Sequence, residues 1–259
     1  MSKDTNEPRP AVVTANNGPA PKPGFFSIDN LRSLGTLLAV ILALRWSVAS
    51  PYHVPTASME PTIKVGDRLL AFKLAYNFKV PFTDITLGHW GTPQRGDIIV
   101  FKYPRDPDID YVKRVVAVGG DEVKLVDDIL YINGKEQPRQ DAENQRSFLA
   151  DIEDDKDIKL LYTEDLFGIT HLVMQNIPSV RHFNRSVWPS PGLAAYTVPK
   201  DAVFCIGDNR DNSTDSRVWG HVPLDYVRGK ALFVIWSVYT PRDATFPTIR
   251  LNRFGKWLY

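Results

Sequence analysis

The stretch GDIIVFKYPRDPDIDYVKRVVAVGGD, residues 96–121, contains the two segments that decide the fold class. Residues 96–103 and 110–118 are short, rich in Val, Ile, Tyr and Phe, and bounded by Gly, Pro and Asp, as is typical of β-strands. Because no long segment after residue 50 repeats at 3.6 residues, we predict a mainly β fold with an antiparallel-sheet core. Three other segments show the same strand pattern: DRLLAF (67–72), DILYINGK (128–135) and AVFCIGD (202–208).

The overall composition is that of an ordinary folded protein and excludes several function classes. The chain has 259 residues, of which 43% are hydrophobic and 24% charged, and its formal net charge is +1. A nucleic-acid-binding protein normally concentrates basic residues, so we expect no nucleic-acid partner. The single cysteine, Cys205, excludes an internal disulfide framework, and no Cys or His cluster has the spacing of zinc ligands.

The N-terminal part differs from the rest of the chain. Residues 1–32 are rich in Pro, Asn, Lys and Asp and hold too little apolar surface to fold, so we predict a disordered tail. Residues 33–50 contain LGTLLAVILALRWSVAS, which fits a short transmembrane anchor because Arg45 can reach the membrane interface. A cleaved secretory signal peptide is the alternative, since Ser47-Val48-Ala49 has small residues at the right spacing.

A polar and then irregular segment divides the β-rich part of the chain. Asn133-Gly134 predicts a tight hairpin turn, and the sequence that follows it carries few strand patterns. We interpret residues 135–197 as an inserted second β subdomain. It separates two halves of the core, residues 51–134 and 198–259.

The C-terminal segment FPTIRLNRFGKWLY, residues 246–259, mixes basic and aromatic side chains. A contact with a membrane interface and a packed terminal strand both fit this pattern. The side chains in question are Arg250, Arg253, Lys256, Phe246, Phe254 and Trp257.

Ser58 and Lys113 are the candidate reactive residues. Pro55 and Pro61 stiffen the loop around Ser58, which suits a nucleophile and a plain surface turn alike. A serine hydroxyl needs a base at neutral pH, and the sequence has no GxSxG elbow. Because side chains alternate along a strand, Lys113 and Arg114 are expected to face opposite ways. A buried Lys113 would have a strongly lowered pKa and act as a general base, and a solvated strand lysine is the alternative.

The segment GDNRDNSTDSRVWG, residues 207–220, is a dense loop of hydrogen-bonding groups. A loop held by its own Asx turns and by pairs between carboxylates and arginines is the default interpretation. A calcium loop is disfavoured because the segment lacks the mid-loop glycine and the glutamate at the twelfth position. The loop also offers the hydroxyl of Ser213 to orient an amine.

Four segments, in the same order along the chain, resemble the sequence boxes of bacterial type I signal peptidases. These enzymes are Ser/Lys proteases that remove signal peptides from exported proteins. Residues from about 135 to 197 match no motif of that family. The four matching segments are VPTASMEPT (54–62), RGDIIVFKYP (95–104), DYVKRVVAVGGD (110–121) and GDNRDNSTDSR (207–217).

The resemblance implies a role for individual residues. Ser58 would be the nucleophile, Lys113 the general base, and Ser213 the residue that orients the lysine amine. The backbone N–H of Ser58 and the hydroxyl of Thr56, where many relatives have Ser, would form the oxyanion hole. Asp208, Asp215 and Arg217 would support the loop. Shallow pockets for small side chains at the −3 and −1 positions of the substrate would be lined by Tyr52, Val54, Pro55, Met59, Ile63, Leu69, Val100, Tyr111 and Val112.

The resemblance also implies partners and a location. The substrates would be signal peptides of exported preproteins, the other partners would be membrane lipid and the export machinery, and the chemistry would need no metal or cofactor. The chain would cross the bacterial cytoplasmic membrane once, with its tail in the cytoplasm and its catalytic domain outside. Two rivals remain. One is a self-cleaving repressor-type protease with the same Ser/Lys pair, and the other is an anchored β-domain that only binds extended peptides.

Overall fold

The computed structural model describes residues 28–79, 85–149, 151–152, 158–177, 188–189, 193–240 and 245–258. The chain divides into two compact units, Met1–Ile41 and Leu42–Tyr259. Most of the predicted disordered tail lies outside the described residues. No helix among the residues that the structure describes is long and apolar enough to cross a membrane.

Helix α1 (Ile28–Ser47) occupies most of the predicted anchor segment, residues 33–50, but its bounds differ. It begins at Ile28, within the predicted tail, and includes the charged Asp29 in its first turn. It ends at Ser47 because the following residues pair with a neighbouring strand as β1 (Ala49–His53). Hydrophobicity along the sequence marked the apolar middle of this helix and neither of its ends.

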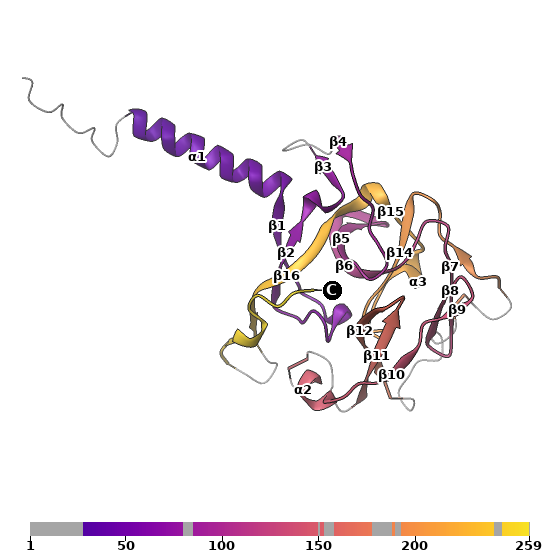
Figure 1. Cartoon of the computed structure of the whole chain (residues 1–259). Helices are drawn as coiled ribbons and strands as arrows, with labels where there is room; N and C mark the ends of the chain where they lie inside the picture. Colours follow the sequence, from indigo (N-terminus) through magenta and orange to yellow (C-terminus); the bar gives the residue numbers. More distant parts are fainter. Residues whose placement is uncertain are drawn as a thin grey trace, which may run out of the picture. The chain divides into compact units, whose positions relative to one another are not determined.

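The main sheet confirms the prediction of a mainly β, antiparallel core. Its strands follow the order β1-β2-β16-β5-β6-β14-β15, with β17 paired to β16, and every pairing is antiparallel (Figure 1). All four predicted strand segments of this sheet are confirmed. The strands after β1 are β2 (Asp67–Phe72), β5 (Ile98–Tyr103), β6 (Asp106–Val118), β14 (Ala202–Ile206), β15 (Val222–Pro223), β16 (Val227–Tyr239) and β17 (Thr248–Ile249).

Strand β16 was not predicted, although it holds the two ends of the sheet together. It pairs with β5 through its first residues and with β2 through the rest, and its register shifts three times along the way. Such bulges bend a strand and interrupt the alternation of buried and exposed side chains. Gly229 lies at the first shift, where an added Cβ would come within 2.7 Å of the Phe72 carbonyl oxygen.

Three smaller sheets complete the fold. The predicted Asn133-Gly134 turn is confirmed: both residues have positive φ and join β8 to β9. The sheet order β13-β7-β8-β9 combines strands from before residue 135 with strands from the predicted insertion. The strands are β7 (Glu122–Val126), β8 (Ile129–Ile132), β9 (Lys135–Glu136) and β13 (Tyr196–Thr197), then β10 (Arg139–Asp141), β11 (Lys159–Leu166) and β12 (Ile169–Asn176), and finally β3 (Asn77–Lys79) with β4 (Thr86–His89).

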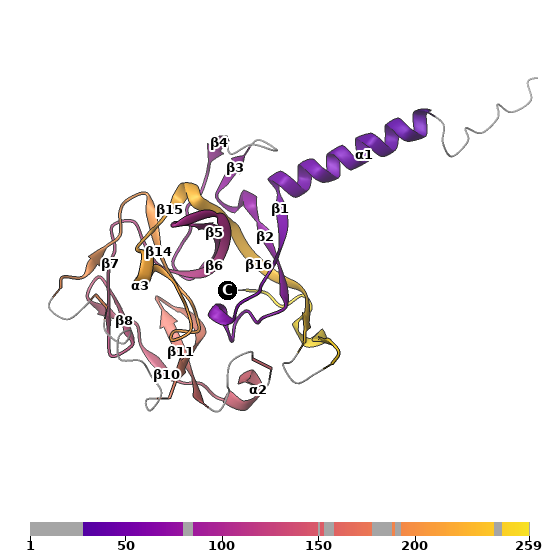
Figure 2. The same cartoon turned by 180° about the vertical axis from the view of Figure 1, so that it is seen from behind.

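The four-stranded sheet and the β10-β11-β12 sheet gather on the β14 side of the main sheet, away from β1 and β2 (Figures 1 and 2). Short helices connect the strands and carry parts of the site. They are η1 (Ala57–Met59), η2 (Lys73–Ala75), α2 (Gln145–Leu149), α3 (Ser216–Trp219), η6 (Leu224–Tyr226) and η7 (Leu251–Arg253).

The core cluster nearest to η1 fixes the predicted nucleophile segment. Met59 and Ile63 are fully buried and pack with Leu69 of β2 and Val234 of β16. Leu258, near the C-terminus, packs in the same cluster. Burial of each of these five apolar side chains stabilises the fold by about 1.5–3 kcal/mol, so hydrophobic contacts of the residues after Ser58 hold its turn in place.

Candidate active site

Ser58 lies in the one-turn helix η1, within a loop that is closed at its base. The N–H of Val54 donates to the Asp67 carbonyl at 3.0 Å, and the N–H of Gly66 donates to the Val54 carbonyl at 3.0 Å. The intervening residues therefore leave and rejoin the sheet at one point. Since Met59 next to the serine is buried in the core, the loop presents Ser58 in a fixed place.

Lys113 reaches Ser58 from strand β6. Its Nζ donates to Ser58 Oγ at 2.7 Å and to the Val112 carbonyl at 2.9 Å. Only 3% of Lys113 is exposed, and this burial lowers the pKa of its amine to about 8, against the opposing effect of Asp215. The two candidate residues, which are 55 positions apart in the sequence, are thus in contact in the structure. The structure also decides against a solvated strand lysine.

Arg114 faces the other way along β6, as expected, but it is fully buried as well. Its Nε and Nη2 donate to the two carboxylate oxygens of Asp208 at 2.9 and 2.8 Å, and its Nη1 donates to the Gly96 carbonyl at 2.9 Å. Burial alone raises the pKa of the Asp208 carboxyl, but the Arg114 guanidinium lowers it below its ordinary value. Both faces of β6 are covered here, so both neighbouring side chains are buried.

The 207–217 loop approaches the nucleophile closely. An added Cβ on Gly207 would lie 2.2 Å from Ser213 Oγ and 2.4 Å from the Ser58 carbonyl oxygen, so only glycine fits. Arg217 Nε and Nη2 each donate to the Asp215 carboxylate at 2.8 Å. Burial alone raises the pKa of Asp215, but pairing with Arg217 lowers it, helped by hydrogen bonds from the Gly207 N–H and the Ser213 side chain.

A cavity of about 600 Å³ opens beside the Ser58–Lys113 pair. Seven of the nine predicted pocket residues line it, whereas Met59 and Ile63 lie in the core beneath the loop. Thr56 also lines it, with its Oγ1 3.5 Å from Ser58 Oγ. The seven are Tyr52, Val54, Pro55, Leu69, Val100, Tyr111 and Val112. The sequence did not indicate the other lining residues His53, Ala57, Val65, Ile109, Asp110, Asn212 and Thr214.

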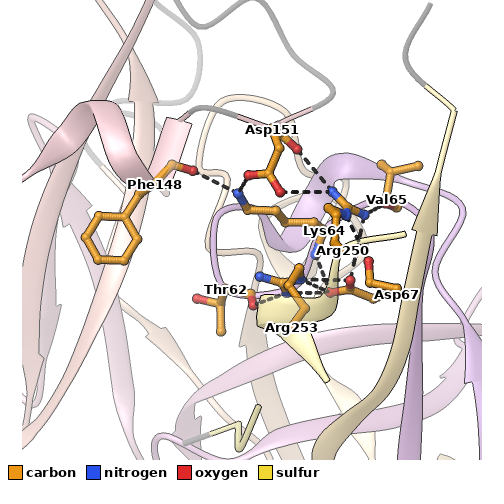
Figure 3. Close-up of polar contacts among 9 residues, drawn as sticks. Thr62, Lys64, Val65, Asp67, Phe148, Asp151, Arg250 and Arg253 are labelled. Carbon is orange, nitrogen blue, oxygen red and sulfur yellow. Dashed lines mark hydrogen bonds and ion pairs between the residues drawn. The ribbon is translucent and has the colours of Figure 1, made fainter. Parts of the chain in front are cut away.

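A second polar cluster, largely buried, is formed around the later residues of this loop, 62–67 (Figure 3). Arg253 donates to the Asp67 carboxylate and to the Thr62 carbonyl, and Arg250 donates to the Val65 carbonyl. Lys64 pairs with Asp151 and donates to the Phe148 carbonyl at 2.9 Å. The cluster ties the nucleophile loop to the C-terminal segment and to the region around α2.

The C-terminal arginines therefore do not form an exposed interfacial contact. Arg250 and Arg253 are 6% and 4% exposed, and the strand before them, β17, pairs with β16. The aromatic side chains Phe246, Phe254 and Trp257 remain largely exposed. No group of acidic, His or Cys side chains within the described residues could hold a metal ion.

Comparison with known proteins identifies the family of the chain. The family model described as signal peptidase, peptidase S26, matches residues 27–236. The chain belongs to this family. Signal peptidase I of Pseudomonas aeruginosa is 34% identical over 253 residues, which cover 93% of this chain and 82% of that protein. Signal peptidase I of Aquifex aeolicus is 33% identical over 234 residues, or 79% of this chain and 82% of that protein.

Among solved structures, a signal peptidase I from Enterococcus faecalis is 27% identical and covers 54% of this chain and 97% of its own. Its TM-score is 0.32, which is too low to support an argument about the fold.

Proposed function

We propose that the chain is a serine endopeptidase that removes signal peptides from exported preproteins, with Ser58 as nucleophile and Lys113 as general base. The observation that carries the proposal is the 2.7 Å contact between Lys113 Nζ and Ser58 Oγ, made by a lysine whose pKa is lowered to about 8. A neutral amine at this distance can accept the hydroxyl proton directly. The type of reaction, cleavage of a signal peptide, is inferred from membership in the signal peptidase family.

The proposed mechanism follows from that contact. Lys113 takes the proton of Ser58 as Oγ attacks the scissile carbonyl, and the resulting ammonium then protonates the leaving amine. Water hydrolyses the acyl-enzyme ester. The backbone N–H of Ser58 and the hydroxyl of Thr56 stabilise the tetrahedral oxyanion, where loss of one such donor typically costs about 10²–10³ in kcat.

The surrounding residues have supporting roles in this proposal. Ser213 orients the lysine amine, and the pairs Asp215–Arg217 and Asp208–Arg114 hold the loop and the strand that flank the lysine. The apolar wall formed by Leu69 and Val100 favours small side chains at −3 and −1, because a shallow pocket rejects larger ones sterically. The proton transfers need no metal or cofactor.

We further propose that α1 attaches the chain to the bacterial cytoplasmic membrane, with the catalytic unit on its outer side and the export machinery nearby. Side chains such as Leu34 and Leu38 are more than half exposed along α1, and water disfavours such an apolar surface. The exposed Phe246, Phe254 and Trp257 offer a lipid contact of the aromatic kind found at membrane interfaces. Co-sedimentation of the full chain with anionic lipid vesicles tests this attachment.

Cleavage of a preprotein with an Ala-x-Ala site tests the catalytic assignment. Ser58→Ala and Lys113→Ala should each abolish cleavage, whereas Lys124→Ala, which removes an exposed strand lysine, should retain it. Full cleavage by either active-site variant would contradict the Ser/Lys assignment. Tight binding of the preprotein without Ser58-dependent cleavage would instead favour a peptide-binding domain, and cleavage confined to the chain itself would favour the repressor-type protease.

A further inference from the structure

One buried residue, Asn209, holds the nucleophile turn by two hydrogen bonds. Its backbone N–H donates to the Ser58 carbonyl at 3.2 Å, and its side-chain Nδ2 donates to the Ala57 carbonyl at 3.1 Å. Asn209 is fully buried. The N–H of Glu60 also donates to the Ala57 carbonyl, at 3.0 Å, so both lone pairs of that oxygen have a partner.

The bond to the Ala57 carbonyl bears directly on the proposed oxyanion hole. The Ala57 carbonyl and the Ser58 N–H belong to the same peptide unit, which is planar and trans, so they point in opposite directions. Whatever fixes the direction of the carbonyl also fixes the direction of the N–H. The hydrogen bond from Asn209 fixes the Ala57 carbonyl toward Asn209, so the Ser58 N–H points away from it. Ala57 and Ser58 both line the cavity.

The inserted segment holds Asn209 in turn. Lys159 of β11 is buried, and its Nζ donates to Asn209 Oδ1 at 3.4 Å. An ammonium can only donate, so it selects the amide rotamer that places the oxygen toward Lys159 and the NH₂ group toward Ala57. On either side of Asn209, the Met174 N–H of β12 donates to the Asp208 carbonyl and the Arg210 N–H donates to the Met174 carbonyl, each at 2.8 Å.

We propose that Asn209 is a positioning residue for the oxyanion hole, and that Lys159 of the inserted β11-β12 hairpin fixes the orientation of its amide. The inference rests on the proposed function, because it takes the Ser58 N–H as an oxyanion donor. It gives residues 159–176 a role in the active site, although none of them lines the cavity. Asn209 acts through the peptide unit of Ser58, and Lys159 acts through Asn209.

The test uses the full chain and a peptide substrate with an Ala-x-Ala site. Asn209→Leu keeps the approximate side-chain size and adds no charge. It should lower kcat by about 10- to 100-fold, less than outright loss of a donor, and leave KM within about twofold. The pH midpoint of the reaction should not move, because the Lys113–Ser58 contact is untouched. Gln137→Met, which removes a buried amide bonded to Lys135 and Phe167, is the matched control and should retain activity.

A peptide aldehyde inhibitor separates positioning from general damage. Ser58 Oγ adds to the aldehyde carbon to form a hemiacetal, whose oxygen occupies the oxyanion position and gains the serine proton. Asn209→Leu should weaken this inhibitor by the same factor as kcat/KM, while a non-cleavable substrate peptide binds unchanged. Equal weakening of both ligands would overturn the proposal, as would an unchanged kcat.

Lys159→Met completes a double-mutant cycle. Alone it should lower kcat by about 3- to 10-fold, and in the Asn209→Leu background it should cost nothing further, because coupled residues are non-additive. Additive losses would show that Lys159 does not act through Asn209. If Asn209→Leu does not fold, Lys159→Met decides alone, and an unchanged kcat overturns the inference. Absence of Ser58-dependent cleavage by the unmodified chain would instead refute the proposed function.

Discussion

The amine of Lys113 should set the pH dependence of cleavage. Burial lowers its pKa from the ordinary value of 10.5 to about 8. At pH 7 the neutral form would then be about 9% of the molecules, compared with about 0.03% for an unperturbed lysine. The neutral fraction of Lys113 at pH 7 is therefore about 300-fold higher than that of an unperturbed lysine, which corresponds to roughly 3 kcal/mol of destabilisation of the buried ammonium.

This pKa predicts the shape of the profile. If kcat/KM follows the neutral fraction of Lys113, it should rise about tenfold per pH unit below about pH 7, less steeply toward pH 8, and flatten above, with a total increase of about 90-fold from pH 6 to pH 9. Initial rates on a fluorogenic peptide with an Ala-x-Ala site, at constant ionic strength, measure this directly. Each sample is returned to pH 8 afterwards to show that exposure to the extreme pH did not inactivate the enzyme.

A control variant identifies the titrating group. Lys256 is another lysine whose pKa is lowered, by partial desolvation and by the nearby Arg253 guanidinium, and Lys256→Met should leave the midpoint near pH 8. A flat profile from pH 6 to 9 would refute a lysine base. A midpoint near 6.5 would point to a histidine in place of the lysine.

Two further predictions concern the arginines around Lys113. Arg114→Met should lower the free energy of unfolding by about 3–5 kcal/mol, because it leaves the Asp208 carboxylate buried and unpaired. Adding Asp208→Leu should recover much of that loss. Urea unfolding measures the stability of both variants. Arg217→Met removes a positive charge that lowers the pKa of Lys113 and exposes the amine to an unpaired Asp215. The midpoint of the pH profile should therefore move to higher pH, and activity lost at pH 7 should partly return at pH 9, whereas a midpoint that stays or falls would contradict this account.

The sequence predicted best where a local pattern has a local cause. Residues 67–72 alternate in a regular strand and form β2 with the predicted bounds. Asn133 and Gly134 tolerate positive φ, and that tolerance determines the hairpin turn. Prolines and apolar neighbours made Ser58 and Lys113 candidates, and only the resemblance to the signal peptidase boxes gave them their roles.

The features that the sequence did not reveal depend on long-range packing. Strand β16 escaped prediction because three register shifts break its period of two. Arg114 pairs with Asp208 across 94 positions and Arg253 with Asp67 across 186, and no spacing rule connects residues so far apart. The contact of Asn209 with the Ala57 carbonyl, across 152 positions, is of the same kind. Such partners become visible only when the sheet order is known.

The charge arrangement explains how a lysine can stay partly neutral among carboxylates. Asp215 and Asp208 both act to raise the pKa of Lys113, and unpaired they would hold its proton. Each is instead bound by an arginine, Asp215 by Arg217 and Asp208 by Arg114, and guanidinium groups remain charged at every relevant pH. The Arg217 guanidinium opposes the effect of the carboxylates on Lys113, and burial, the largest influence, sets the direction in which the pKa of Lys113 moves. Among these five side chains, Lys113 is therefore the one whose charge changes near pH 8, which is the property that a general base requires.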